Sequence, residues 1–151
     1  MKRETHGIIS LGLAAIALAA AAQSMFQQSS ILGIIYMFLA VLSVPVILYA
    51  FCAKCPDRER CGHVVPGRSA KVFKTRKRDP YTASDLFLTV ASLAVLFLLP
   101  QIWLWRHPVA FGAFWILMAL AAVDIRGNVC RGCGNEFCPG RPDRKGVHGK
   151  K

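Results

Sequence analysis

The chain has 151 residues, of which 54% are hydrophobic, and a formal net charge of +11. Its apolar residues form long blocks rather than recurring at the helical or strand period of a soluble domain. A hydrolase triad, a P-loop and charges inside the blocks are all missing from the sequence. The sequence therefore predicts neither a hydrolase, nor a nucleotide-binding enzyme, nor an ion carrier acting alone, and no catalytic constellation is recognised.

Four apolar blocks follow one another along the chain, at residues 7–22, 31–51, 86–105 and 109–123. A membrane-spanning helix takes about 20 mostly apolar residues. Helices are expected because backbone polar groups in lipid must bond within their own segment. Pro45 and Pro100 lie inside the second and third blocks, where each is expected to kink its helix. The predicted fold class is an all-α integral membrane protein, with four transmembrane helices arranged as two helical hairpins.

The first block also has a second interpretation. The basic start "MKRETHG", the apolar stretch and the small residues before Gln23 are typical of a secretory signal peptide cleaved near Ala22. A repeat between the two halves of the chain favours a retained helix, because the first block is then the counterpart of the third.

Lysine and arginine are concentrated on one side of the predicted spans. They precede the first block, fill the segment between the second and third, and follow the fourth, whereas the two opposite turns hold Arg106 alone. Short loops rich in Lys and Arg stay in the cytoplasm. Both termini and the middle segment are therefore predicted to be cytoplasmic, in a prokaryotic inner membrane. Trp103 and Trp105 are then expected at the outer interface.

The chain divides into two similar halves. A hairpin at residues 7–51 is followed by a basic, Cys-rich cytoplasmic loop at 52–84, and a hairpin at 85–125 is followed by a basic, Cys-rich cytoplasmic tail at 126–151. Each polar segment opens with a C-x-x-C motif and contains a Cys-Pro dipeptide. The first segment holds Cys52, Cys55, Cys61 and His63, and the second holds Cys130, Cys133 and Cys138.

All six cysteines fall on the predicted cytoplasmic side, in a reducing compartment where structural disulfides are rare. A C-x-x-C turn directs two sulfurs at one point, and thiolates and imidazoles are zinc ligands. In one partition, each segment binds its own zinc ion, the second with the help of His148. In the other, the two C-x-x-C motifs share one ion, and Cys61 and Cys138 are left over. The predicted metal ligands are Cys52, Cys55, Cys61, His63, Cys130, Cys133 and Cys138.

An iron–sulfur cluster is the alternative cofactor, because it uses the same thiolates. Residues 130–139 contain three cysteines and a trailing proline, as some cluster sites do, although not at the bacterial ferredoxin spacing. In its helix pairs and in the placement of "YAFCAKCP" and "CGNEFCPG", the chain resembles the small membrane ferredoxin-type subunits of periplasmic nitrate reductase systems and related polyferredoxin membrane proteins. Its spacings are C-x2-C-P and C-x4-C-P rather than C-x3-C-P. The resemblance implies electron transfer between membrane quinol and cytoplasmic or periplasmic carriers.

Other interpretations of the cysteines and the charge need no metal. A C-x-x-C motif can be a redox-active dithiol, but the usual thioredoxin-like βαβ context is missing. The thiols can also serve a redox partner or a membrane complex, with the protein as a scaffold. The basic loop between the halves is expected to lie against anionic lipid of the bilayer. Nucleic acid is not the expected partner, because no recognition motif accompanies the charge.

Polar residues near the ends of the blocks are assigned structural roles. Residues 67–85 are expected to form a surface loop, with Ser84 as the N-cap of the third span and Asp85 favourable at the positive end of that helix. Asp124 is expected to pair with Arg126 or another nearby base. Two histidines without ligand-type neighbours in the sequence are expected to be interfacial side chains: His6 and His107.

Overall fold

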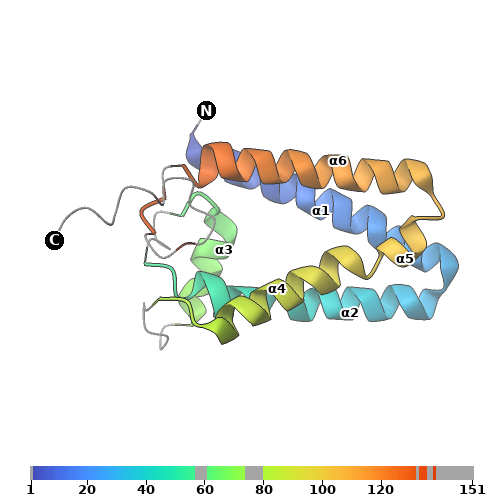
Figure 1. Ribbon diagram of the computed structural model, residues 1–151, viewed down its shortest axis with the longest axis horizontal. Coiled ribbons are helices and arrows are strands. Elements are labelled where there is room, and N and C mark those ends of the chain that lie inside the picture. Colours follow the sequence, from blue (N-terminus) through green and yellow to red (C-terminus); the bar gives the residue numbers. More distant parts are fainter. Residues whose placement is uncertain (1, 57–60, 74–79, 132, 136–137, 139–151) are drawn as a thin grey trace.

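The computed structural model describes residues 2–56, 61–73, 80–131, 133–135 and 138. Within these residues the regular structure is entirely helical, and four helices are long and apolar enough to cross a membrane. They are Arg3–Gln28, Ser30–Cys52, Ala83–Leu104 and Pro108–Val129. The predictions of an all-helical fold and of four spans are confirmed at this level. The spans lie side by side along one axis, and the start of the first span and the end of the fourth lie at the same end of the bundle (Figure 1).

The first two spans are joined by Ser29 alone. α1 (Arg3–Gln28) is longer than the predicted block 7–22, because flanking residues such as Glu4 and Gln23 are good helix formers although they are not apolar. α2 (Ser30–Ile47) passes directly into a π-helical turn, Leu48–Cys52.

The second half of the chain contains four helical pieces. The third span consists of α4 (Ala83–Leu98) and the short α5 (Gln101–Leu104). The fourth consists of α6 (Pro108–Asp124) followed by a second π-helical turn, Ile125–Val129.

The third span is interrupted at Pro100, as its sequence predicts. Proline has no N–H to offer the carbonyl of Leu96 one helical turn earlier. That carbonyl accepts a hydrogen bond from the hydroxyl of Tyr36 on α2 instead, at 2.9 Å. The next carbonyl, of Phe97, accepts from the side-chain amide of Gln101 at 2.6 Å. Side chains thus satisfy backbone groups that lipid could not.

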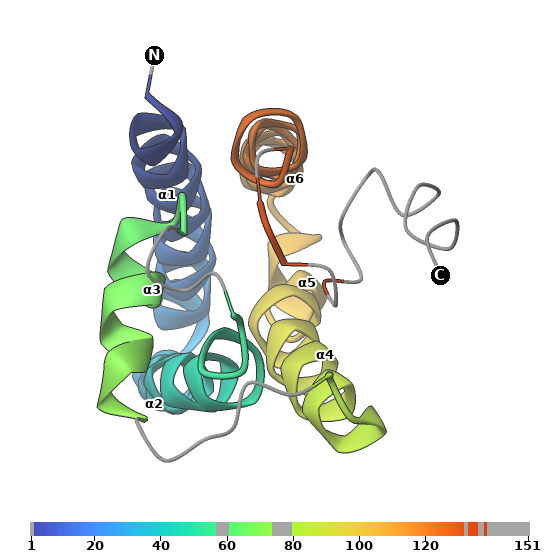
Figure 2. The ribbon, with the colours of Figure 1, turned by 90° about the vertical axis from the view of Figure 1, so that its left-hand side faces the viewer.

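The helices pack mainly across the two halves of the chain. α1 has its most extensive contacts with α6 and also packs on α2, while α2 packs on α4; α4 and α6 contact each other little. Figure 2, which looks along the bundle, shows α5 between α4 and α6, and α5 contacts both. On α1 the buried residues are small except for Met25, and two of them, Ala17 and Ala21, cluster with Leu104 and Phe114. Small residues allow helix backbones to approach closely in a membrane.

The outward faces of the spans are apolar. Ile31 is 70% exposed, Phe38 is 62% exposed and Val123 is 71% exposed. In water such apolar surfaces would promote aggregation, whereas in a bilayer lipid covers them. The chain therefore has the surface of a multi-pass membrane protein.

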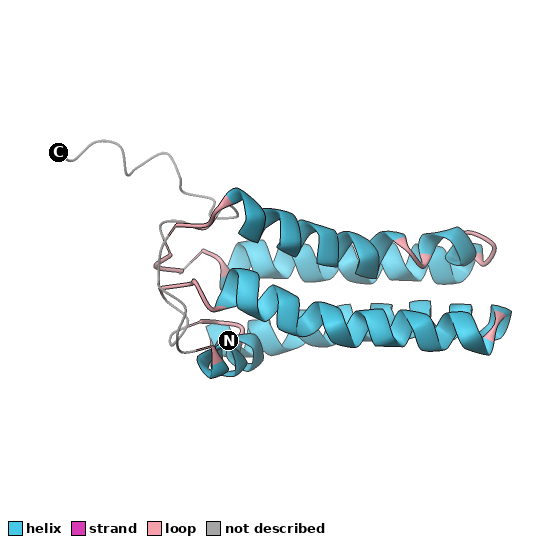
Figure 3. Ribbon diagram, turned by 90° about the horizontal axis from the view of Figure 1, so that it is seen from below, coloured by secondary structure: helices cyan, strands magenta, loops and turns pink. Residues whose placement is uncertain are grey.

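One short helix lies across the bundle rather than along it. α3 (Val64–Ser69) continues into a 3-10 turn, Ala70–Val72, and both contact the end of the second span. The prediction of a surface loop at residues 67–85 is therefore wrong for its first part, because Gly67 and Ala70 are buried and hold this part helical. Figure 3 shows this short helix at the loop-rich end of the bundle.

Candidate functional site

The two C-x-x-C motifs have closely similar backbone structures. The first motif begins at the last residue of a π-helical turn, and the second directly follows one. Each turn closes through a bond of 2.7 Å, from Ala53 N–H to the Leu48 carbonyl and from Cys130 N–H to the Ile125 carbonyl. Within the motifs, the N–H of the second cysteine donates to the carbonyl of the first, at 3.2 Å for Cys55 and 3.1 Å for Cys133. π-Helical turns are rare and often occur at functional sites. The sequence repeat is thus also a structural repeat.

All six cysteines gather at one end of the bundle, which we call the thiol end. It is formed by the start of α1, the two π-helical turns, α3 and the two Cys-rich segments (Figure 1). Each cysteine is a half-buried thiol. Gly62, next to Cys61, packs against Val129, next to Cys130 of the other segment, and the Cys61 thiolate raises the pKa of Cys130. The two segments, far apart in the sequence, therefore form one cluster.

Burial raises the pKa of the Cys130 thiol above its usual value. The thiolates of Cys138, Cys133 and Cys61 raise this pKa further, and only the Arg3 guanidinium lowers it. The cluster therefore disfavours bare thiolates, because each negative sulfur opposes the others. A bound cation reverses that balance, since it stabilises every thiolate near it.

A buried amide links the second segment to the first. The side-chain amide of Asn135 donates to the sulfur of Cys55 at 3.4 Å and to the hydroxyl of Tyr81 at 3.0 Å. Asn135 is only 1% exposed. The Tyr81 ring stacks on Phe51, with 4.7 Å between centroids, and its pKa is raised by burial and by Cys55, Cys138 and Cys52. Sequence reasoning missed Asn135 and Tyr81, because neither is part of a motif.

His63 is packed against the start of α1. Its ring forms a hydrogen bond with the carbonyl of Gly7, and its Nδ1 is buried with no hydrogen-bond partner. Burial lowers the pKa of His63, so the imidazole is neutral at pH 7. A neutral imidazole with an unused nitrogen lone pair is the form that binds metals. The predicted role of His63 as a metal ligand stays a prediction.

Two glycines allow α1 to approach the first segment this closely. A Cβ on Gly7 would overlap the carbonyl oxygen of Gly62, and one on Gly62 would lie 2.8 Å from Val129 Cγ1. Arg3 then reaches the other segment, where its Nε donates to the carbonyl of Val129 at 2.9 Å. The first two turns of α1 therefore hold both halves of the thiol end.

Asp124 has different partners from those its sequence neighbours suggest. Its Oδ1 lies 2.7 Å from Nδ1 of His6 on α1 and accepts from the Asn128 amide at 2.7 Å. The predicted pairing with Arg126 is therefore replaced by a long-range pair, and His6 is not merely an interfacial side chain. The other carboxylate oxygen of Asp124, Oδ2, is buried and has no hydrogen-bond partner.

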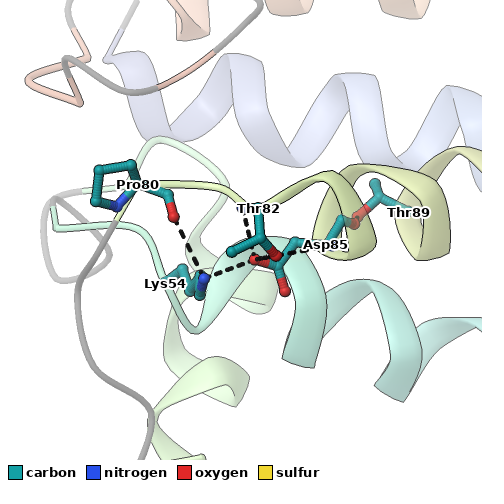
Figure 4. Close-up of polar contacts among 5 residues, drawn as sticks. All are labelled: Lys54, Pro80, Thr82, Asp85 and Thr89. Carbon is teal, nitrogen blue, oxygen red and sulfur yellow. Dashed lines mark hydrogen bonds and ion pairs between the residues drawn. The ribbon is translucent and has the colours of Figure 1, made fainter.

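The first C-x-x-C turn is fastened to the third span by a buried ion pair (Figure 4). Lys54 Nζ lies 2.6 Å from Asp85 Oδ2 and 3.3 Å from the Pro80 carbonyl. The N-cap of α4 is Thr82 rather than Ser84, because Thr82 and Asp85 form a reciprocal capping box. Asp85 is at the helix start as predicted, but it also positions the thiol segment.

The structure brings the seven predicted ligands to one end of the bundle without forming a coordination shell. Among the described residues, no three His, Cys, Asp or Glu side chains are grouped closely enough to hold a metal ion. His148, and the basic residues at 74–78, lie outside the described residues. The two Cys-rich segments are therefore in contact at the thiol end, but their described side chains do not surround a common point.

Comparison with known proteins does not place the chain in a family. The chain matches no protein-family profile, no curated protein and no solved structure. The resemblance to membrane ferredoxin-type subunits stays a prediction from the sequence.

Proposed function

We propose that this protein is a small multi-pass membrane protein that binds metal at its thiol end, with structural zinc as the metal. The observation that carries the proposal is the close packing of Gly62 against Val129, the sequence neighbours of Cys61 and Cys130, which brings the two Cys-rich segments together. Thiolates and imidazole are the ligands of structural zinc sites. A cluster made from both halves favours ligands shared between the segments over two separate sites.

The local chemistry supports a bound cation. The neighbouring sulfurs disfavour one another's ionisation, and His63 Nδ1 has no hydrogen-bond partner. A zinc ion would hold thiolates in place of thiols and would accept the free lone pair of His63. Because metal binding is coupled to folding, the two cysteine-bearing turns are expected to move closer together when the ion binds.

The proposed orientation places the thiol end in the cytoplasm of a bacterial inner membrane, with two helical hairpins that each lead into a Cys-rich segment. The excess of Lys and Arg on this side supports it. A membrane-impermeant thiol reagent added to intact cells should leave Cys52 and Cys130 unlabelled, and labelling should require permeabilised cells. Labelling of either cysteine in intact cells would show that the thiol end faces outward and would contradict the proposed orientation.

Metal content after purification without oxygen tests the main proposal. Colourless protein with about one or two zinc ions is expected, since a structural ion takes four ligands. Cys55→Ser and Cys133→Ser should each lose the metal if the halves share an ion, whereas the control Ser92→Ala should keep it. Protein without metal would refute the proposal and leave a thiol-bearing scaffold for a partner complex.

An iron–sulfur cluster for electron transfer is the second candidate. The hydrogen bond from Asn135 to the sulfur of Cys55 favours it, since such bonds to sulfur tune cluster potentials. Brown protein with iron and acid-labile sulfide would support this alternative and exclude the zinc proposal.

A further inference from the structure

We propose that the helical segment at residues 64–72, which is α3 with its 3-10 turn, lies in the membrane interface and binds headgroups of anionic lipid. We call it the interface segment. Its surface is distinct from the thiol cluster, and the proposal does not depend on metal binding.

The interface segment lies level with the start of the first span and the end of the second. At its start, Gly62 packs on Gly7, about one turn inside α1. At its end, the Phe73 ring meets the Tyr49 ring edge to face at 5.5 Å, and Tyr49 belongs to the second span. Figure 2 shows the segment running from α1 towards α2, across the direction of the spans. A helix in this position lies at headgroup depth when the bundle crosses a bilayer.

The segment has a buried face and an exposed face. Gly67 and Ala70 are buried against the bundle. On the opposite face Val65 is 57% exposed and Val72 is 80% exposed, with the exposed Arg68 between them. These three residues share one side of a helix, because they are spaced three and four apart. Apolar and basic side chains on one exposed face are typical of a helix that lies on a membrane.

The charge of the segment selects the kind of lipid. Arg68 and Lys71 are both exposed, and residues 64–73 contain no acidic side chain. Basic residues beside a bilayer attract anionic headgroups, by about fivefold per charge. The start of the first span is also exposed and apolar at Ile8, which is 57% exposed. Lipid can cover the valines and this surface together, so the proposed occupant is the bilayer rather than a soluble protein.

Photo-cross-linking of the full-length protein in nanodiscs tests the location. The nanodiscs contain equal amounts of phosphatidylglycerol and phosphatidylcholine, and p-benzoylphenylalanine replaces Val65 or Val72. Lipid adducts are expected at both positions. Absence of lipid adducts at both valines, or cross-links to a soluble protein at Val65 in intact cells, would overturn the proposal.

The same adducts test the charge selectivity. Arg68→Gln combined with Lys71→Gln should lower the ratio of anionic to zwitterionic adducts at Val65, by about fivefold for each charge removed. The control Arg126→Gln removes an exposed base from the fourth span and should leave the ratio unchanged. An unchanged ratio in the double variant would overturn the assignment of anionic headgroups.

Discussion

The ammonium group of Lys54 lies 2.6 Å from the carboxylate of Asp85, and both side chains are buried. Lys54 stands between Cys52 and Cys55, whereas Asp85 is in the first turn of the third span. The pair therefore links the first thiol turn to the second half of the chain. It also explains how a lysine within a C-x-x-C motif can be buried without leaving its charge unpaired.

Asp85→Ala is expected to lower the free energy of unfolding by about 3–5 kcal/mol, because it leaves the buried Lys54 charge without its partner. Lys54→Met should also be destabilising. The double variant should lose less than the sum of the two single losses, since no buried charge is then unpaired. The free energy of unfolding of all three variants can be measured in detergent micelles. Strictly additive losses would show that Lys54 and Asp85 are not coupled.

Gly7→Ala should destabilise the protein by about 1–3 kcal/mol, because the new methyl group overlaps the Gly62 carbonyl. It should also speed alkylation of Cys61, which adjoins Gly62. Gly12→Ala is the matched control, since nothing lies within 4 Å of its added Cβ. In that variant, helix propensity alone should stabilise α1 by up to about 1 kcal/mol. The two substitutions are thus expected to have opposite signs in the same unfolding assay.

Tyr36→Phe should lower the free energy of unfolding by about 1–3 kcal/mol, because the Leu96 carbonyl loses the hydroxyl that donates to it at the Pro100 interruption. The cost should shrink in a Pro100→Ala background, where residue 100 regains a backbone N–H for that carbonyl. A double-mutant cycle on unfolding free energies tests the coupling. Equal losses of unfolding free energy in the two backgrounds would show that the tyrosine hydroxyl does not compensate for the hydrogen bond that Pro100 removes.

Alkylation of Cys130 in the metal-free protein should begin at higher pH than that of an ordinary cysteine, for which the pKa is about 8.5. The pKa of Cys130 is raised, so the thiol stays protonated, and unreactive, as the pH passes through the usual range. Arg3→Gln should shift the profile further upward, because Arg3 lowers this pKa. Glu4→Gln is the control in the same helical turn. Site-resolved mass spectrometry across pH gives each midpoint, and a midpoint at or below the ordinary value would refute the prediction.

The sequence alone determined the helical class, the four spans, the interruption at Pro100 and the two C-x-x-C motifs. These features depend on local patterns: a run of apolar residues needs a helix in lipid, and a proline removes a hydrogen bond wherever it stands. Local patterns were less reliable at the ends of elements. Thr82 rather than Ser84 caps α4, and residues 64–72 are helical because the bundle buries one side of them.

Only the tertiary structure decided which residues meet. The contacts of His6 with Asp124, of Lys54 with Asp85 and of Asn135 with Cys55 each join positions far apart in the chain. No motif encodes such pairs, because they arise when α1 packs on α6 and α2 packs on α4. The same packing brings the two cysteine segments together at the thiol end. Sequence spacing cannot show this, since it describes neighbours along one chain segment and not across a bundle.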